Sequence, residues 1–190
     1  MELFARRRYF FCRYCGSFHF LDTPESEGVR ILETPARGLA CVRCGGKLAT
    51  ALLDDTHPVE VCAVCRGVLM PRAVFAQVVY TRRTWATSPP VAPLPLDARE
   101  LERVVCCPSC SRRMEAHPYY GPGNVVMDSC PPCDLIWLDP GELKQIADAP
   151  GGDRGVRKPP QRDTSTTMMP AQRAGLGRAP DPLDVLLDLF

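Results

Sequence analysis

The stretch that decides the fold is residues 107–146, CPSCSRRMEAHPYYGPGNVVMDSCPPCDLIWLDPGELKQI. It contains two C-x-x-C pairs about twenty residues apart, Cys107/Cys110 and Cys130/Cys133. Two thiolates separated by two residues can face one ion from a tight turn. Two such turns supply the tetrahedral set of sulfur ligands that zinc prefers. The segment between the pairs has the length of a short β-hairpin, so the spacing predicts a closed, structural zinc site.

The same pattern occurs earlier in the chain, over residues 41–80. Each copy has two C-x-x-C pairs, a His-Pro step, a short run of β-branched residues before the second pair, and a helical pattern after it. Such agreement at fixed offsets indicates one supersecondary unit used twice. It predicts two zinc ions, held by Cys41, Cys44, Cys62, Cys65, Cys107, Cys110, Cys130 and Cys133.

Length and composition favour two small domains over one large core. Twenty prolines and fourteen glycines among 190 residues are heavy usage for a compact fold, and units this small need a staple such as zinc. The predicted fold class is small zinc-stabilised β, with two tandem ribbons, short C-terminal helices, and a disordered linker and tail. The expected parts are an N-terminal extension (1–40), the first ribbon and helix (41–80), a proline-rich linker (81–104), the second ribbon and helix (105–149), a disordered tail (150–180) and an apolar C-terminal segment (181–190).

Helix boundaries can be predicted in both copies. In the second, Asp139 is the expected N-cap, Pro140 the first helical residue and Glu142 the third, and the helix should end before Pro150. In the first, Pro71 starts the helix. The expected buried stripes are Leu143, Ile146 and Ala147 in the second helix and Val74, Phe75, Val78 and Val79 in the first.

Residues 107–146 resemble the transcription factor IIB-type zinc-ribbon family of bacterial proteins, whose pattern is C-P-x-C, a hairpin, and then D-x-C-P-x-C-x-G-x-W-L-D-x-G-E-L. The resemblance implies a zinc ribbon in which Cys107, rather than Cys106, is the first ligand. Leu135 stands where the family has glycine. The positions that match are Cys107, Pro108, Cys110, Asp128, Cys130, Pro131, Cys133, Trp137, Leu138, Asp139, Gly141, Glu142 and Leu143.

The first copy resembles the same family in a degenerate form. It keeps the four cysteines and Gly67, but Leu69 stands at the position of the family tryptophan, and the acidic residues that follow are missing. The resemblance covers residues 41–148 and implies fold and metal, not a role in transcription.

A fifth pair, Cys12/Cys15, lies in the aromatic stretch FFCRYCGSFHF and predicts half a zinc knuckle. Two cysteines do not close a site. His19 is the candidate third ligand for a third zinc ion, with His57 or Cys106 as the fourth. Three alternatives stay open: a partner chain completes the site, the pair is metal-free and its aromatic neighbours pack on the first ribbon, or the pair is redox-active.

Charge and hydropathy restrict the function classes. The formal net charge is +1, so no global field draws the chain to nucleic acid. No apolar run approaches the roughly 18 residues of a membrane helix, and the N-terminus lacks a secretory signal. These features predict a cytoplasmic protein without membrane association. Paired cysteines in that compartment bind metal more often than they form disulfides.

Three functions remain. The favoured one is an adaptor or protein-interaction module with a protein partner; closed zinc sites and the lack of a catalytic constellation argue against an enzyme or a small-molecule substrate. The second is a nucleic-acid-binding transcriptional regulator, suggested by arginines over residues 154–178 and by Arg6-Arg7-Arg8 beside aromatic residues. The third, a thiol redox protein, would use Cys12 and Cys15.

The last ten residues, DPLDVLLDLF, are again apolar. Leucines and a phenylalanine at helical spacing predict a short helix, which either docks back onto a ribbon or binds another protein. In the second case Leu187, Leu189 and Phe190 are expected to insert into an apolar groove of that partner. The segment Leu186–Phe190 also resembles the bacterial sliding-clamp-binding peptide, with Leu186 in place of its glutamine.

Overall fold

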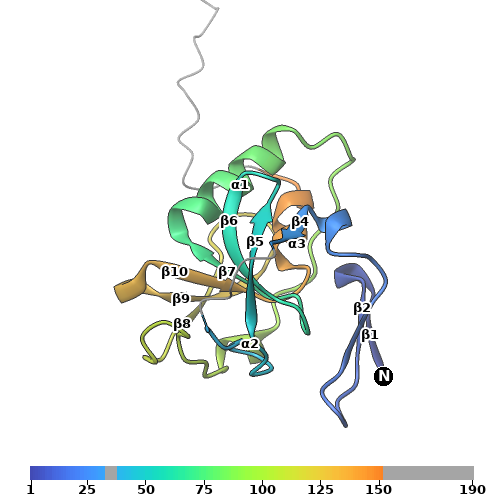
Figure 1. Ribbon diagram of the computed structural model, residues 1–190. Helices are drawn as coiled ribbons and strands as arrows, with labels where there is room; N and C mark the ends of the chain where they lie inside the picture. The colour runs from blue at the N-terminus through green and yellow to red at the C-terminus, as the bar shows by residue number, and fades with distance from the viewer. Residues whose placement is uncertain (33–37, 152–190) are drawn as a thin grey trace, which may run out of the picture. The chain divides into compact units, whose positions relative to one another are not determined.

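The computed structural model describes residues 1–32 and 38–151, which belong to one unit (Figure 1). Two antiparallel sheets form it, one of three strands in the order β1-β2-β3 and one of seven in the order β4-β5-β6-β7-β10-β9-β8. The strands are β1 (Glu2–Phe4), β2 (Tyr9–Phe11), β3 (Phe18–Phe20), β4 (Val29–Ile31), β5 (Leu48–Leu53), β6 (His57–Cys62), β7 (Val68–Pro71), β8 (Glu115–Pro118), β9 (Val126–Cys130) and β10 (Leu135–Leu138). The helices are α1 (Arg72–Thr84), α2 (Ala98–Leu101) and α3 (Glu142–Asp148), with 3₁₀ turns at Ala5–Arg7, Glu25–Glu27 and Pro131–Cys133.

Each predicted ribbon is a three-stranded meander, β5-β6-β7 in the first copy and β8-β9-β10 in the second. The two meanders join edge to edge, because β7 pairs antiparallel with β10. In this pairing Leu69 lies opposite Trp137, its own counterpart in the repeat. A pseudo-two-fold axis therefore passes between these two residues. The sequence predicts tandem ribbons on a linker, and the structure places both ribbons in one continuous sheet.

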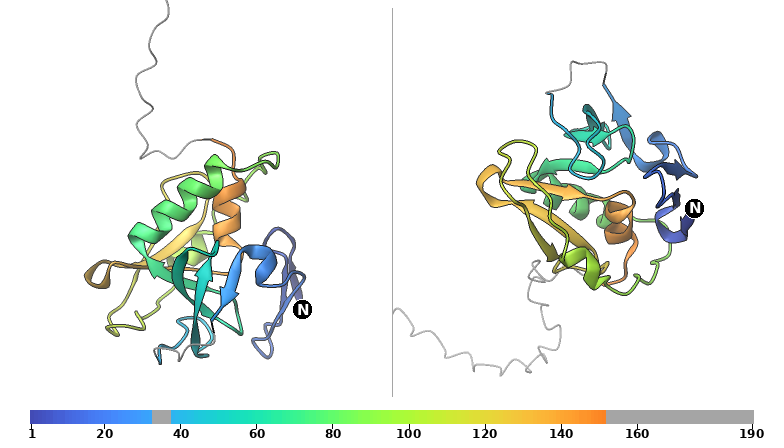
Figure 2. Two further views of the ribbon diagram at one scale, coloured as in Figure 1. Left: turned by 45° about the horizontal axis from the view of Figure 1, so that its top comes forward. Right: turned by 90° about the horizontal axis from the view of Figure 1, so that it is seen from below.

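The apolar core lies between this sheet and the two longer helices. In Figures 1 and 2, α1 and α3 run side by side over one face of the sheet, and they contact each other. The predicted stripe of α1 is buried at Phe75, Val78 and Val79, and that of α3 at Leu143 and Ile146. Among the described residues, no helix combines the length and the apolar character that crossing a bilayer requires.

The predicted start of the second helix is early by two residues. The helix α3 begins at Glu142 because Gly141, at φ 80°, takes a left-handed conformation that ends the preceding turn. Glu142 Oε2 accepts a hydrogen bond from the Asp139 N–H at 2.7 Å, which is one half of a capping box. Asp139 does not cap the helix with its side chain. The helix ends at Asp148, before Pro150 as predicted.

The first helix follows Pro71 as predicted but continues to Thr84, into the segment expected to be linker. The linker itself was expected to be disordered, whereas the structure places it along the second ribbon. The Val91 N–H donates to the Asp148 carbonyl at 2.7 Å, and Asn124 Nδ2 donates to the Leu94 carbonyl at 2.9 Å. Prolines fix an extended path and leave carbonyls exposed as acceptors, so such a segment can be held from outside.

Candidate metal centres

The eight predicted ribbon cysteines form two groups of four. In each group, the sulfur atoms all lie within 4.8 Å of one another. The Cys41–Cys65 and Cys44–Cys62 sulfur pairs are 3.5 and 3.4 Å apart, and the Cys110–Cys130 pair is 3.6 Å apart. A tetrahedral zinc ion with bonds of about 2.3 Å needs sulfurs about 3.8 Å apart. Both groups can therefore hold zinc with little movement.

Backbone geometry explains why the cysteines converge. In the first pair of each ribbon, the residue after the second cysteine donates its N–H to the carbonyl of the first: Gly45 to Cys41 at 3.0 Å and Ser111 to Cys107 at 2.8 Å. This closes a tight turn that points both sulfurs the same way. The residue after the second cysteine has positive φ in all four ribbon pairs, at Gly45, Arg66, Ser111 and Asp134.

The electrostatics of each group call for a cation. Contact with the Cys62 sulfur raises the pKa of the Cys41 thiol to about 12, and contact with Cys41 lowers the pKa of Cys62. Burial raises the pKa of Cys130 to about 12. Four thiolates within 4.8 Å of one another repel, so all four can ionise together only beside a compensating cation. Zinc supplies that charge, and its four sulfur ligands leave no position for water or substrate.

Trp137 links the two centres. It is fully buried and belongs to one apolar cluster with cysteines of both groups. A Cβ built on Gly67 would lie 2.1 Å from Trp137 Cζ2, so the ring fits only because this residue of the first ribbon is glycine. Leu135 occupies the position in the second copy that is equivalent to Gly67, and it packs on the same cluster. Leu69 occupies the position in the first copy that is equivalent to Trp137, and its side chain is smaller. The large Trp137 is therefore combined with Gly67, and the smaller Leu69 with Leu135, at the two equivalent places about the pseudo-two-fold axis.

A buried ionic cluster beside Trp137 was not predicted. Asp139 is 2 % exposed and accepts hydrogen bonds from Trp137 Nε1 at 3.0 Å, from Arg43 and from Arg103. Burial opposes the charge of Asp139, but the two guanidinium groups hold its pKa below the ordinary value. Arg43 comes from a knuckle of the first ribbon and Arg103 from the segment after α2. One carboxylate therefore holds three segments together.

Two further carboxyls extend this cluster. Glu142 is fully buried; Arg7 Nη2 lies 3.3 Å from its Oε1, and burial together with Asp139 raises its pKa to about 8. Asp128 pairs with Arg103, yet burial raises its pKa to about 6. The family motif contains all three acidic residues. Their presence in so apolar a stretch was the sequence signal that could have indicated a buried ionic cluster. Spacing alone does not identify arginines from distant segments as their partners.

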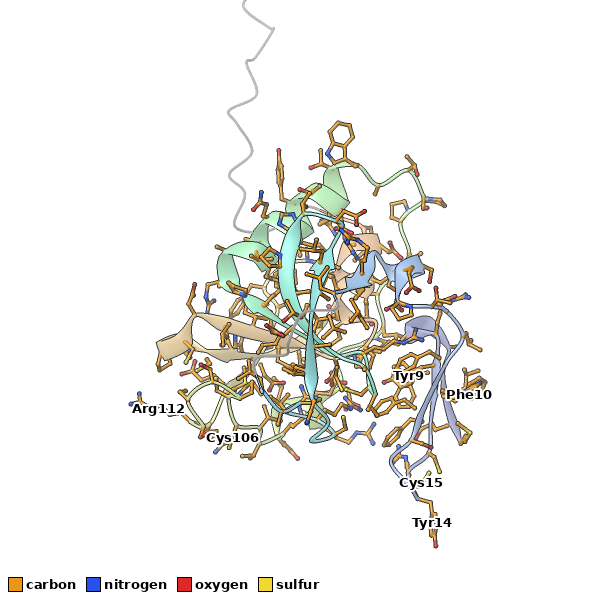
Figure 3. All side chains as sticks on the ribbon, in the orientation of Figure 1. Tyr9, Phe10, Tyr14, Cys15, Cys106 and Arg112 are labelled. Carbon is orange, nitrogen blue, oxygen red and sulfur yellow. The ribbon has the colours of Figure 1, made fainter. Side chains whose placement is uncertain are left out.

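The fifth cysteine pair occupies the turn between β2 and β3. Figure 3 shows Cys15 at the tip of this hairpin, with Cys106 on another side of the molecule. His19 pairs with Phe10 within the hairpin, and His57 lies at the start of β6. Among the described residues, neither histidine nor Cys106 forms a group of three ligands with the pair. A third zinc ion within one chain therefore remains a prediction.

The aromatic residues around that pair pack against the first ribbon. Tyr9 is fully buried among phenylalanine rings, and Arg43 lies over the ring of Phe18 at 5.4 Å. Arg66, from the other knuckle of the first ribbon, lies over Phe20 at 4.1 Å. Arg7, considered above as part of a phosphate-contacting arm, is instead buried against Glu142, so it is not available to phosphates.

The arginine-rich tail and the apolar segment with Leu187, Leu189 and Phe190 lie outside the described residues.

Comparison with known families matches residues 106–149 to a family model described as a transcription factor zinc-finger, the TFIIB-type zinc ribbon. The cysteine group at residues 41–65 fits a degenerate first copy of the same unit. Neither the curated proteins nor the solved structures gave a match.

Proposed function

Because residues 106–149 form a TFIIB-type zinc ribbon and residues 41–65 carry the cysteines of a degenerate copy, we propose that the chain is a tandem-ribbon adaptor that binds another protein. In this role the zinc ions are structural. They fix four knuckles on one sheet, and the knuckles present side chains to the partner.

The observation that carries this proposal is that most arginine side chains lie beside carboxylates of the same chain. Binding to nucleic acid requires lysines and arginines that can reach phosphates. Most arginines of the described chain instead lie within ion-pair distance of carboxylates of the same chain, and Arg7, Arg43 and Arg103 are largely buried in these pairs. Those in ion pairs are Arg7, Arg8, Arg13, Arg30, Arg43, Arg72, Arg82, Arg99 and Arg103.

The knuckles also present apolar side chains to solvent. Val64, between the cysteines of the second knuckle, is 55 % exposed, and Tyr14, at the β2–β3 turn, is fully exposed. Exposed aliphatic and aromatic side chains on rigid turns are suited to protein recognition, because little conformational entropy is lost on binding.

A second candidate function, nucleic-acid binding, rests on three other basic residues. Lys47, Arg112 and Arg113 are exposed, and in the described part of the chain they make no ion pair. Lys47 follows the first knuckle of the first ribbon, and the two arginines follow the first knuckle of the second. Phosphate contacts by all three would make the logarithm of the affinity fall with the logarithm of salt concentration at a slope of about 3 or less.

Site-specific photo-crosslinking tests the adaptor proposal. A photoreactive amino acid at position 64 should crosslink in cells to a defined protein. The same residue at position 80, which is 61 % exposed on α1, should not capture that protein. The purified zinc-loaded chain should show no binding to labelled DNA or RNA at low salt. Nucleic-acid binding that is lost in Arg112→Ala/Arg113→Ala would favour the second candidate instead.

A further inference from the structure

The turn that holds Cys12 and Cys15 has the same backbone geometry as the zinc-site knuckles. The Gly16 N–H donates to the Cys12 carbonyl at 2.8 Å, and the Cys12 N–H donates to the Ser17 carbonyl at 2.9 Å. Gly16 has φ 70°, like Gly45 at 72° in the first ribbon. The hairpin is therefore shaped to point two sulfurs at one ion, as each knuckle of the two complete sites does.

This fifth knuckle is anchored at its base and open at its tip. Phe18 and Phe20 fix the hairpin on the first ribbon through the guanidinium groups of Arg43 and Arg66, and Arg13 in the turn pairs with Glu2 at 2.6 Å. Cys15 and Tyr14 are exposed, and in Figure 3 the ring of Tyr14 points away from the body of the molecule. No other ligand-bearing residue of the described segments joins the pair in a group of three.

From this geometry we propose that a second copy of the chain completes the site. One zinc ion would bind Cys12 and Cys15 of both chains, in a four-sulfur site on a two-fold axis. Each complete site within the chain is made of two knuckles facing each other, and the hairpin supplies only one. A two-fold contact places identical patches against each other, so a second copy offers the missing knuckle in its preformed shape.

The protons and charges of this contact can be accounted for. Four thiols lose their protons when the ion binds, and the resulting site carries two negative charges. Arg13 of each chain lies between the two ligands in sequence, and its guanidinium group is held there by the ion pair with Glu2. The same contact would cover Tyr14. This burial would account for a fully exposed aromatic ring at the tip of the hairpin.

The test is zinc stoichiometry together with mass in solution, using the full chain under reducing conditions. Wild type should sediment as a dimer with 2.5 zinc ions per chain. Cys12→Ser/Cys15→Ser should be a monomer with 2.0, and its two ribbon sites should remain filled, which shows that it is folded. Cys106→Ser, which changes an exposed cysteine outside the pairs, should behave like wild type. Cobalt(II) should reproduce the half-equivalent with the absorption of a tetrahedral four-thiolate site.

Several results would overturn the proposal. A wild-type monomer with 2.0 zinc ions would mean that the pair binds none, and a monomer with 3.0 would mean that one chain completes the site. A dimer that survives in the double variant would place the contact elsewhere. A dimer that forms only when the reductant is left out, and that resists chelation, would be a disulfide. None of these outcomes bears on whether Val64 contacts a partner protein.

Discussion

At the scale of single residues, the pair Trp137 and Gly67 shows how two unequal repeats share one interface. The ring of Trp137 crosses to the first ribbon and occupies the space above Gly67. Its counterpart Leu69 is too small to require a glycine, and Leu135 occupies that position in the second copy. Leu135 replaces the glycine of the family pattern in the second copy, and Leu69 replaces the tryptophan in the first. The two replacements therefore match each other in size.

Removing the ring should be costly. Because Trp137 is fully buried, Trp137→Ala should lower the free energy of unfolding by about 3–5 kcal/mol. Trp85 is 77 % exposed, so Trp85→Ala should change stability by less than about 0.5 kcal/mol. Chemical denaturation at fixed zinc concentration measures both. Equal effects of the two variants would contradict this assignment.

The contact between these residues also predicts coupling. Gly67→Ala should destabilise the wild-type chain, since the new methyl group overlaps the ring of Trp137. In a Trp137→Leu background the same change should cost much less. A double-mutant cycle of unfolding free energies measures the difference. If the two changes are additive, the ring does not press on this glycine.

Glu142 predicts an unusual dependence on pH. Its folded-state pKa is about 8, above the ordinary value of 4.5, so its neutral form stabilises the fold fully below about pH 4.5 and this contribution is lost as the pH rises through 8. Glu142→Gln keeps the neutral shape at every pH. The variant should match wild type near pH 4.5 and be the more stable near pH 8.5. Denaturation of both at each pH tests this, and a constant difference would show that Glu142 does not titrate in that range.

At the scale of elements, Asp139 decides how the parts are joined. It connects β10 to the first ribbon through Arg43 and to the segment after α2 through Arg103. Arg7 then brings the N-terminal hairpin to the adjoining Glu142. The acidic residues of the motif thus fasten three other segments to the second ribbon, in addition to beginning a helix.

Neutralising this residue should loosen those elements together. Asp139→Asn leaves Arg43 without its charged partner and leaves Arg103 with Asp128 alone, and breaking a buried ion pair costs about 3–5 kcal/mol. Asp134 offers a matched control, because its ion pair with Arg72 is exposed and asparagine tolerates its positive φ. Asp134→Asn should cost under about 1 kcal/mol. Hydrogen exchange should show β2 and β3 opening in the first variant only.

At the scale of the whole molecule, the shared sheet makes the two ribbons one folding unit. The strands β7 and β10 pair directly, and the cysteines of both centres contact one apolar cluster around Trp137. Metal-binding free energy is folding free energy in units this small. Loss of one centre should therefore be felt at the other.

This expectation distinguishes a joined pair of ribbons from a tethered pair. Cys130→Ser should weaken zinc binding at both centres, and stepwise chelation of wild type should give one cooperative unfolding transition with both ions released together. Calorimetry and a chromophoric chelator report the two quantities. Two separate transitions, with the first centre unaffected by Cys130→Ser, would show that the ribbons fold independently.

By itself the sequence determined the local chemistry. The C-x-x-C spacings predicted both four-cysteine groups, and the periodic apolar residues predicted α1 and α3, because turns, caps and stripes depend on neighbours within a few positions. The join between β7 and β10, the exchange of bulk between Trp137 and Gly67, and the arginines around Asp139 were decided only by the tertiary structure. Each of these depends on segments tens of residues apart, and which partner fills a buried space or meets a buried charge is set by packing in three dimensions.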